Sequence, residues 1–199
     1  IVMNKKLSSG GGCQMVRAIG LVETISIAAG IETADAMIKI APVKLFIARP
    51  ICPGKFLILV GGEVGAVKNS LKEGCRKAEE YLADSVLIPR VHEDVFPALE
   101  GGIVLDDLDS LNSLGVIETF SVTASILAAD AAVKAGNIKL VEIRPAIGLG
   151  GKSYVTMLGN VSAVKTAVEA GCQKAEPEGT LVKSVVIPNA SKDLLISLL

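Results

Sequence analysis

The residues from Arg49 to Lys55 form a turn, Arg-Pro-Ile-Cys-Pro-Gly-Lys, that places Cys52 between two prolines and a glycine. Prolines restrict the backbone and glycine permits a tight reversal, so the sulfur of Cys52 should point in a defined direction. Thiolates hold iron–sulfur clusters, but a cubane cluster takes about four, commonly from closely spaced cysteines of one chain. This sequence has no such spacing. One chain therefore offers one ligand, whereas three copies of Cys52 around a threefold axis would hold three corners of a cluster and leave one iron open.

The other cysteines give weaker signals. Cys75 and Cys172 lie at equivalent places on apolar helical stripes, which favours packing in the core, and Cys13 lies in a glycine-rich stretch where an exposed thiol is expected. Free cysteine behaves mostly as a small hydrophobic residue, so Cys52 could also be an incidental thiol. The residues alone leave both interpretations of Cys52 open.

Two further motifs resemble catalytic or binding sequences only in part. The run from Gly148 to Ser153 ends in Gly-Lys-Ser like a phosphate loop, but Ala146 stands where such a loop needs its first glycine, and a strand pattern follows. His92 is the only histidine, so a zinc site or a catalytic triad lacks its partners. We expect no catalytic residues and a protein that is not an enzyme.

The chain reads as a tandem duplication. Residues 20–50 and 115–145 share fourteen identical positions at an offset of 95, and beyond the turn the offset becomes 97. Glu23 recurs as Glu118 in this comparison, which argues for a structural part in both copies. A period of this length exceeds the repeats of solenoid proteins and predicts two domains. The expected boundaries are an N-terminal tail at 1–16, a first domain at 17–103 and a second domain at 112–199.

Each copy carries the same order of predicted elements. β-rich runs predict strands, apolar residues at helical spacing predict helices, and Ser26 is placed to cap the first helix. The order βαββαβ is that of a ferredoxin-like split βαβ arrangement. We therefore predict an α+β fold of two such domains, each a four-stranded antiparallel sheet with helices on one face and a short C-terminal helix. In the first copy the strands are expected at 18–23, 43–48, 55–60 and 85–88, and the helices at 27–41, 64–82 and 94–99.

Composition excludes several classes of partner. Half of the residues are apolar, the net charge is −1 and no basic cluster stands out, so nucleic acid is not an expected partner. The mean hydropathy of +0.54 is high, but no apolar run approaches the ~18–20 residues that span a bilayer, so we expect no membrane partner. The apolar excess is better explained by surfaces buried between subunits. The N-terminal stretch does not read as a signal peptide, which predicts a cytoplasmic location and reduced thiols.

Several runs resemble a bacterial microcompartment (BMC) shell domain, and the second copy carries the same marks. Two such domains in one chain are similar to the tandem-domain shell proteins, and the turn at 51–56 with the loop at 148–152 resembles the propanediol-utilisation type. The resemblance covers nearly everything from Ala18 onward. The runs that carry it are Gly20 to Thr24, Ala34 to Lys39, Val43 to Leu45 and Gly62 to Val67.

This resemblance implies a specific role. The chain would form a homotrimer shaped like a hexamer and would tile a microcompartment shell with other shell proteins. Cys52 of three subunits would hold a [4Fe-4S] cluster at the central pore for electron transfer across the shell, with an encapsulated redox enzyme as a possible partner. The pore loop would comprise Ile51, Pro53, Gly54, Gly148, Leu149, Gly150 and Gly151, and the tile edge Asp35, Lys39, Asp130 and Lys134.

Two other functions remain open at this point. One is a shell tile whose pore selects a metabolite and carries no cluster. The other is a duplicated ferredoxin-like sensor of a small ligand, which would stay a discrete small oligomer and form no sheets.

Overall fold

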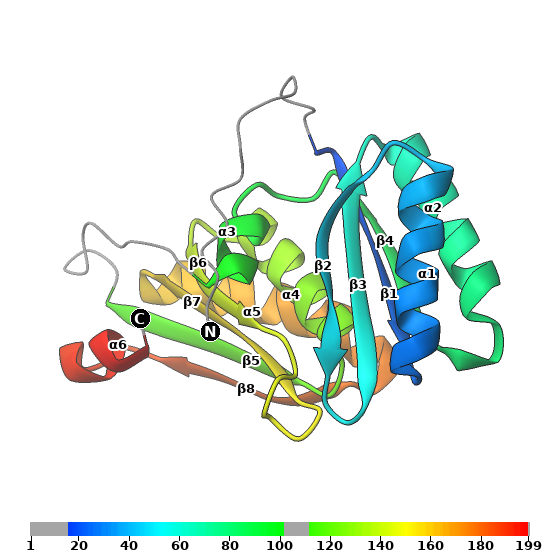
Figure 1. Ribbon diagram of the computed structural model, residues 1–199. Helices are drawn as coiled ribbons and strands as arrows, with labels where there is room; N and C mark the ends of the chain where they lie inside the picture. The colour runs from blue at the N-terminus through cyan, green and yellow to red at the C-terminus, as the bar shows by residue number, and fades with distance from the viewer. Residues whose placement is uncertain (1–15, 102–111, 199) are drawn as a thin grey trace.

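The computed structural model describes residues 16–101 and 112–198, which form two domains of the same design (Figure 1). The first domain consists of β1 (Ala18–Thr24), α1 (Ile27–Ile40), β2 (Lys44–Ile51), β3 (Lys55–Gly62), α2 (Val64–Ala78), the short helix η1 (Glu79–Tyr81), β4 (Leu82–Pro89) and α3 (Val95–Glu100). The second consists of β5 (Ser113–Thr119), α4 (Val122–Ala135), β6 (Lys139–Arg144), β7 (Ser153–Gly159), α5 (Val161–Ala175), η2 (Glu176–Glu178), β8 (Leu181–Ile187) and α6 (Lys192–Leu198).

Each domain has one four-stranded antiparallel sheet, ordered β2-β3-β1-β4 in the first and β6-β7-β5-β8 in the second. β1 and β2 run in the same direction with β3 between them, antiparallel to both, which is the split βαβ arrangement. β1 pairs with β3 from Ala18 opposite Gly62 to Thr24 opposite Phe56. Helices α1 and α2 cover one face of the first sheet (Figure 1). The predicted α+β fold class is confirmed.

Local chemistry explains where the helices begin and end. The hydroxyl of Ser26 accepts a hydrogen bond from the Ala29 amide at 3.3 Å, and Ser121 does the same for Ala124 at 3.2 Å, so both first helices have the N-caps that serine favours. The prediction of a helix over 64–82 is wrong at its end. Residues 79–81 form a 3₁₀ turn after α2, and Leu82 begins β4, from which it still packs against the core of its domain.

The two domains fill the space between their first helix and their sheet differently. In the first domain, a Cβ atom at Gly30 would lie 2.5 Å from the Cβ of Phe56, so only glycine fits beside that ring. The equivalent residues of the second domain are Ser125 and Ser153, whose hydroxyls lie 2.6 Å apart and share a hydrogen bond. A glycine and a phenylalanine in one copy thus occupy the place of two serines in the other.

The domains share one hydrophobic core. The face of the first sheet that α1 and α2 leave open carries Ile19 and Leu21, which belong to the same buried cluster as Ile126 of α4 and Val95 of α3. Helix α4 therefore lies between its own sheet and the first domain and is buried along most of its length. Helix α1 has no second sheet to cover it, so its outer side is exposed.

Candidate functional site

Cys52 lies at the tip of the hairpin that joins β2 to β3, as the spacing of the turn predicted. Ile51 before it is buried and Cys52 itself is partly exposed. The Cys52–Pro53 peptide bond is cis, and Gly54 has a φ of 76°, a left-handed conformation that glycine adopts without a steric penalty. The turn thus holds the thiol at the end of a paired hairpin, with Pro53 and Gly54 exposed beside it.

The equivalent loop of the second domain lies against this turn. It connects β6 to β7, and Gly148, Gly150 and Gly151 all have positive φ angles. The amide of Cys52 donates a hydrogen bond to the carbonyl oxygen of Ala146 at 2.6 Å. A Cβ atom at Gly151 would lie 3.1 Å from Cδ of Pro53. The two loops therefore meet at the same end of the molecule, where Figure 1 shows both at the bottom of the view.

The described part of one chain shows no cluster of metal-ligating side chains. Cys52, Cys75 and Cys172 are free thiols, and residues 16–101 and 112–198 contain no group of three or more histidine, cysteine, aspartate or glutamate side chains that could share an ion. Cys172 packs against the shared core, as its place on a helical stripe predicted. Cys13 and its tail lie outside the described residues. A cluster at Cys52 would require thiolates from more than one chain.

Lys55, the last residue of the turn, forms an ion pair with the buried Glu23. Lys55 Nζ lies 3.2 Å from Oε2 of Glu23, a side chain that is only 1% exposed. The other oxygen, Oε1, accepts hydrogen bonds from the Thr123 amide at 3.3 Å and the Thr123 hydroxyl at 3.2 Å, at the N-terminus of α4. A helix N-terminus favours a carboxylate, so Glu23 joins the two domains. The sequence analysis did not identify Lys55 or Thr123 as interface residues. The repeat does contain a signal for the ion pair, because Glu23 recurs as Glu118 and Lys55 recurs as Lys152.

The second copy of this pair is partly exposed. Glu118 Oε1 lies 2.9 Å from Nζ of Lys152, and the side chains are 32% and 42% exposed. No described helix N-terminus donates a hydrogen bond to Glu118, whereas the N-terminus of α4 lies against Glu23 of the first sheet. The Glu23–Lys55 pair therefore lies at the interface between the two domains, whereas the equivalent pair, Glu118 and Lys152, lies at a surface that no other domain of the chain covers.

The four residues expected at a tile edge also differ between copies. Asp35 pairs with Lys39 at 2.5 Å on the exposed surface of α1. Asp130 pairs with Lys134 at the same distance, but its other oxygen accepts a hydrogen bond from the His92 amide at 2.8 Å, and the residue is buried. Asp130 thus takes part in the contact between the domains of one chain. The tile-edge role of these residues stays a prediction.

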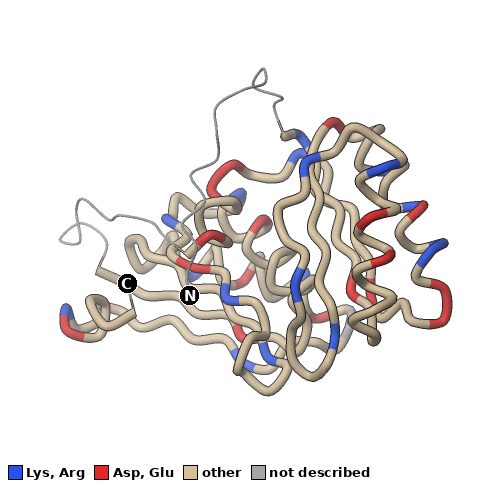
Figure 2. Tube along the Cα trace, viewed as in Figure 1, with Lys and Arg blue, Asp and Glu red and all other residues tan. Residues whose placement is uncertain are grey.

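Charges of both signs are spread over the two domains, including the helices α1 and α2 (Figure 2). Among the described residues, no helix is both long enough and apolar enough to cross a membrane.

Comparisons with known proteins agree with this architecture. The family model described as "BMC domain" matches residues 18–91 and 113–190, one match in each domain. The chain is 44% identical over 180 residues to the bacterial microcompartment shell protein PduT of Citrobacter freundii, covering 90% of this chain and 96% of that protein. It is 33% identical to the carboxysome assembly protein CcmO of Synechocystis sp., of which it spans 63%.

The fold also matches a solved relative. A crystal structure of a microcompartment protein from Desulfitobacterium hafniense superimposes with a TM-score of 0.83 at 45% identity, covering 90% of this chain and 98% of that one. The family model covers both halves of the chain, and PduT, a relative of similar length, is a shell protein of a microcompartment. The chain therefore belongs to the BMC-domain family and is a structural shell protein of a bacterial microcompartment.

Proposed function

We propose that three copies of this chain close into a ring of six similar domains, which tiles the microcompartment shell. The observation that carries this is the apolar stripe of α1. Ile31 is 57% exposed, whereas its repeat equivalent Ile126 on α4 is fully buried by the first domain. The neighbouring stripe residues, Ile27 and Ile38 on α1, are also exposed, while Val122 and Val133 on α4 are buried. A second chain that presents its second sheet to α1 would bury this stripe as α4 is buried here.

The partly exposed ion pair of Glu118 and Lys152 supports the same contact. Within one chain, Glu23 accepts hydrogen bonds at the N-terminus of α4. Its equivalent Glu118 would meet the N-terminus of α1 in a neighbouring chain, where Ala28 stands at the position of Thr123 and supplies an amide without a hydroxyl. A contact that joins the second domain of one chain to the first of the next is heterologous, so it produces a ring if the rotation closes.

At the axis of such a ring, we propose that Cys52 of three subunits holds a [4Fe-4S] cluster. The donor set fits this group only in an assembly, because one chain brings one thiol at a loop tip and the equivalent loop of the second domain brings none. Buried Ile51 and the adjacent Pro53 would hold each sulfur in place, and glycines of the second loop leave room beside it. When bound, the cluster would supply one-electron redox chemistry, which suits electron transfer across the shell.

The remaining partners follow from this arrangement. Lys39 and Asp35 are exposed on α1, and we assign them, with Lys134, to contacts with other shell proteins at the tile edge, where the buried Asp130 would act by holding Lys134. An encapsulated redox enzyme is the expected electron partner. We assign the chain no catalytic role.

The test is the iron and sulfide content of protein purified without air, with its visible absorbance. We expect a brown protein with a broad band near ~400 nm and close to one cluster per three chains. Cys52→Ser should remove the colour and the iron while trimers still form, and Cys75→Ser is the matched control that should retain both. Iron–sulfur absorbance that persists in Cys52→Ser would exclude the assignment. A colourless trimer in every variant would instead favour a tile whose pore passes a metabolite.

A further inference from the structure

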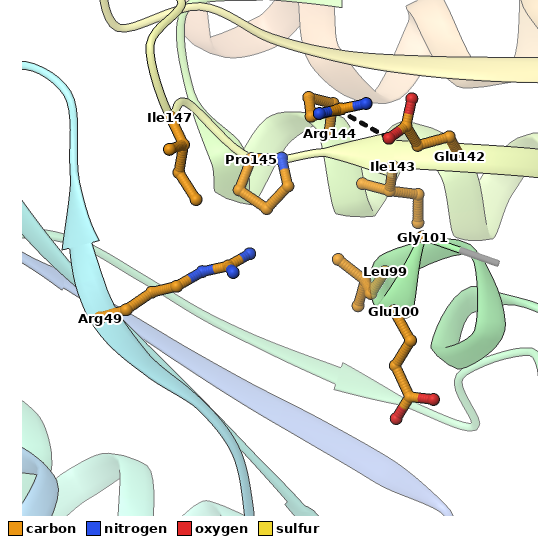
Figure 3. Close-up of a pocket in the computed structure, with 9 residues that line it drawn as sticks. All are labelled: Arg49, Leu99, Glu100, Gly101, Glu142, Ile143, Arg144, Pro145 and Ile147. Atoms are coloured by element: carbon orange, nitrogen blue, oxygen red, sulfur yellow. Dashed lines mark ion pairs between the residues drawn. The ribbon is translucent and has the colours of Figure 1, made fainter. Parts of the chain in front are cut away.

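A cavity of about 210 Å³ lies between β2 of the first domain and β6 of the second, next to α3 (Figure 3). Two arginines line it, Arg49 at the end of β2 and Arg144 at the end of β6, and they are repeat equivalents. The cavity lies within one chain, so its existence depends on neither the proposed trimer nor the cluster.

The two arginines are paired differently. Nε of Arg144 lies 2.6 Å from Oε1 of Glu142, and this hydrogen bond raises the pKa of Arg144. The position equivalent to Glu142 in the first domain is Ile47, which offers no charge. Within the described residues no carboxylate pairs with Arg49. Glu100 also lines the cavity, but its carboxylate points away from the guanidinium of Arg49 (Figure 3).

Among the residues that the structure describes, Arg49 is therefore a cation without a counter-charge. Although the residue is exposed overall, partial burial of its side chain lowers the pKa of Arg49, and no acid in the described part of the chain offsets this effect. A positive charge that has lost part of its water gains more from a bound anion than a fully hydrated one does. The planar guanidinium also matches the two oxygens of a carboxylate.

The wall also contains Glu100, Glu142 and Arg144, but the side chains that the guanidinium of Arg49 faces are apolar (Figure 3). The guanidinium of Arg49 points toward the space among Pro145, Ile147 and Leu99 (Figure 3). These side chains offer no hydrogen-bond donors to a second charged group, but they can cover a hydrocarbon tail. The cavity is smaller than the ~300–1,000 Å³ that is usual for drug-sized ligands, so it suits a molecule of few atoms.

We propose that this cavity binds a small monocarboxylate with a short apolar tail, with the carboxylate on Arg49 and the tail against Pro145, Ile147 and Leu99. An inorganic oxyanion such as phosphate would satisfy the guanidinium but would leave the apolar wall without a partner. The assigned class is therefore an amphipathic carboxylate of a few carbon atoms.

The test is isothermal titration calorimetry of the full chain with sodium butyrate, and with butyramide as the uncharged probe of the same shape. Butyrate should bind and butyramide should not. Arg49→Gln should weaken butyrate binding about tenfold or more, the effect of losing a hydrogen bond to a charged group. Arg49→Lys should weaken binding less than Arg49→Gln, because the charge remains and the fork is lost. Circular dichroism and the elution volume of each variant confirm that it folds.

The matched control is Arg76→Gln, which removes the same charge from the exposed surface of α2, where Arg76 pairs with Glu73. It should leave butyrate binding unchanged. Equal weakening by Arg76→Gln, equal binding of butyramide, or no butyrate binding at all would each overturn the proposal. The same titration is carried out with inorganic phosphate. If phosphate binds more tightly than butyrate, the assignment to a carboxylate with an apolar tail is overturned.

Discussion

The exposed stripe on α1 gives the sharpest prediction about assembly. Replacing Ile31 with Lys should break the proposed ring while leaving each chain folded, because the side chain lies on the outer side of α1 and not in the core of its own domain. Its equivalent Ile126 shows what this position becomes when a sheet covers it, since that side chain has no exposed area.

The magnitude follows from the area still to be buried. Complete burial of an isoleucine side chain contributes about 1.5–3 kcal/mol, and Ile31 has 57% of its area left to bury, so the wild-type contact should gain about 1–2 kcal/mol at each interface. A lysine forfeits this gain and must also keep its ammonium hydrated, which brings the loss to about 2 kcal/mol or more. A trimer has three such interfaces, so the association constant should fall by roughly four orders of magnitude.

The assay is sedimentation velocity over a concentration series, with circular dichroism to confirm the fold. The matched control is Ile40→Lys. Ile40 is on the same helix and is 56% exposed, but its equivalent Ala135 is exposed too, so this position should stay outside the interface. We expect Ile31→Lys to sediment as a monomer at concentrations where the wild type and Ile40→Lys are trimers. An intact trimer of Ile31→Lys, or equal dissociation of both variants, would refute the reasoning.

Two further predictions concern groups near the loops. Lys55→Met should lower the free energy of unfolding, measured in urea, by about 2–4 kcal/mol, because Glu23 would remain buried without its cation. This figure is below that for a fully buried pair because Lys55 is partly exposed. A loss below about 0.5 kcal/mol would contradict this account. Burial and then the nearby Glu142 raise the pKa of Tyr154, so the folded state should lose stability as the pH rises above the unfolded value of about 10, and Glu142→Gln should lower the pKa measured from phenolate absorbance. A tyrosine titration unchanged by that substitution would contradict the assignment.

The local parts of this protein could be predicted from its residues. The cap at Ser26 and the turn around Cys52 depend on backbone restrictions of a few neighbouring residues, and both were found where the sequence placed them. The helix expected to run to Leu82 ended early, because helical spacing of apolar residues does not distinguish a continuing helix from a 3₁₀ turn followed by a buried strand.

By itself, the sequence determined the duplication, the split βαβ order and the single thiol in one loop of the pair, since these depend on residue types and spacing along the chain. Only the tertiary structure decided which equivalent residues are buried and which are exposed. Ile31 and Ile126, or Glu23 and Glu118, have the same local pattern, but the first sheet packs on α4 of the other domain, whereas no sheet of the same chain covers the outer side of α1. Burial of a residue depends on which distant part of the chain packs against it. With two copies in one chain, the first domain can cover α4 of the second, but the equivalent surface on α1 is left for another chain.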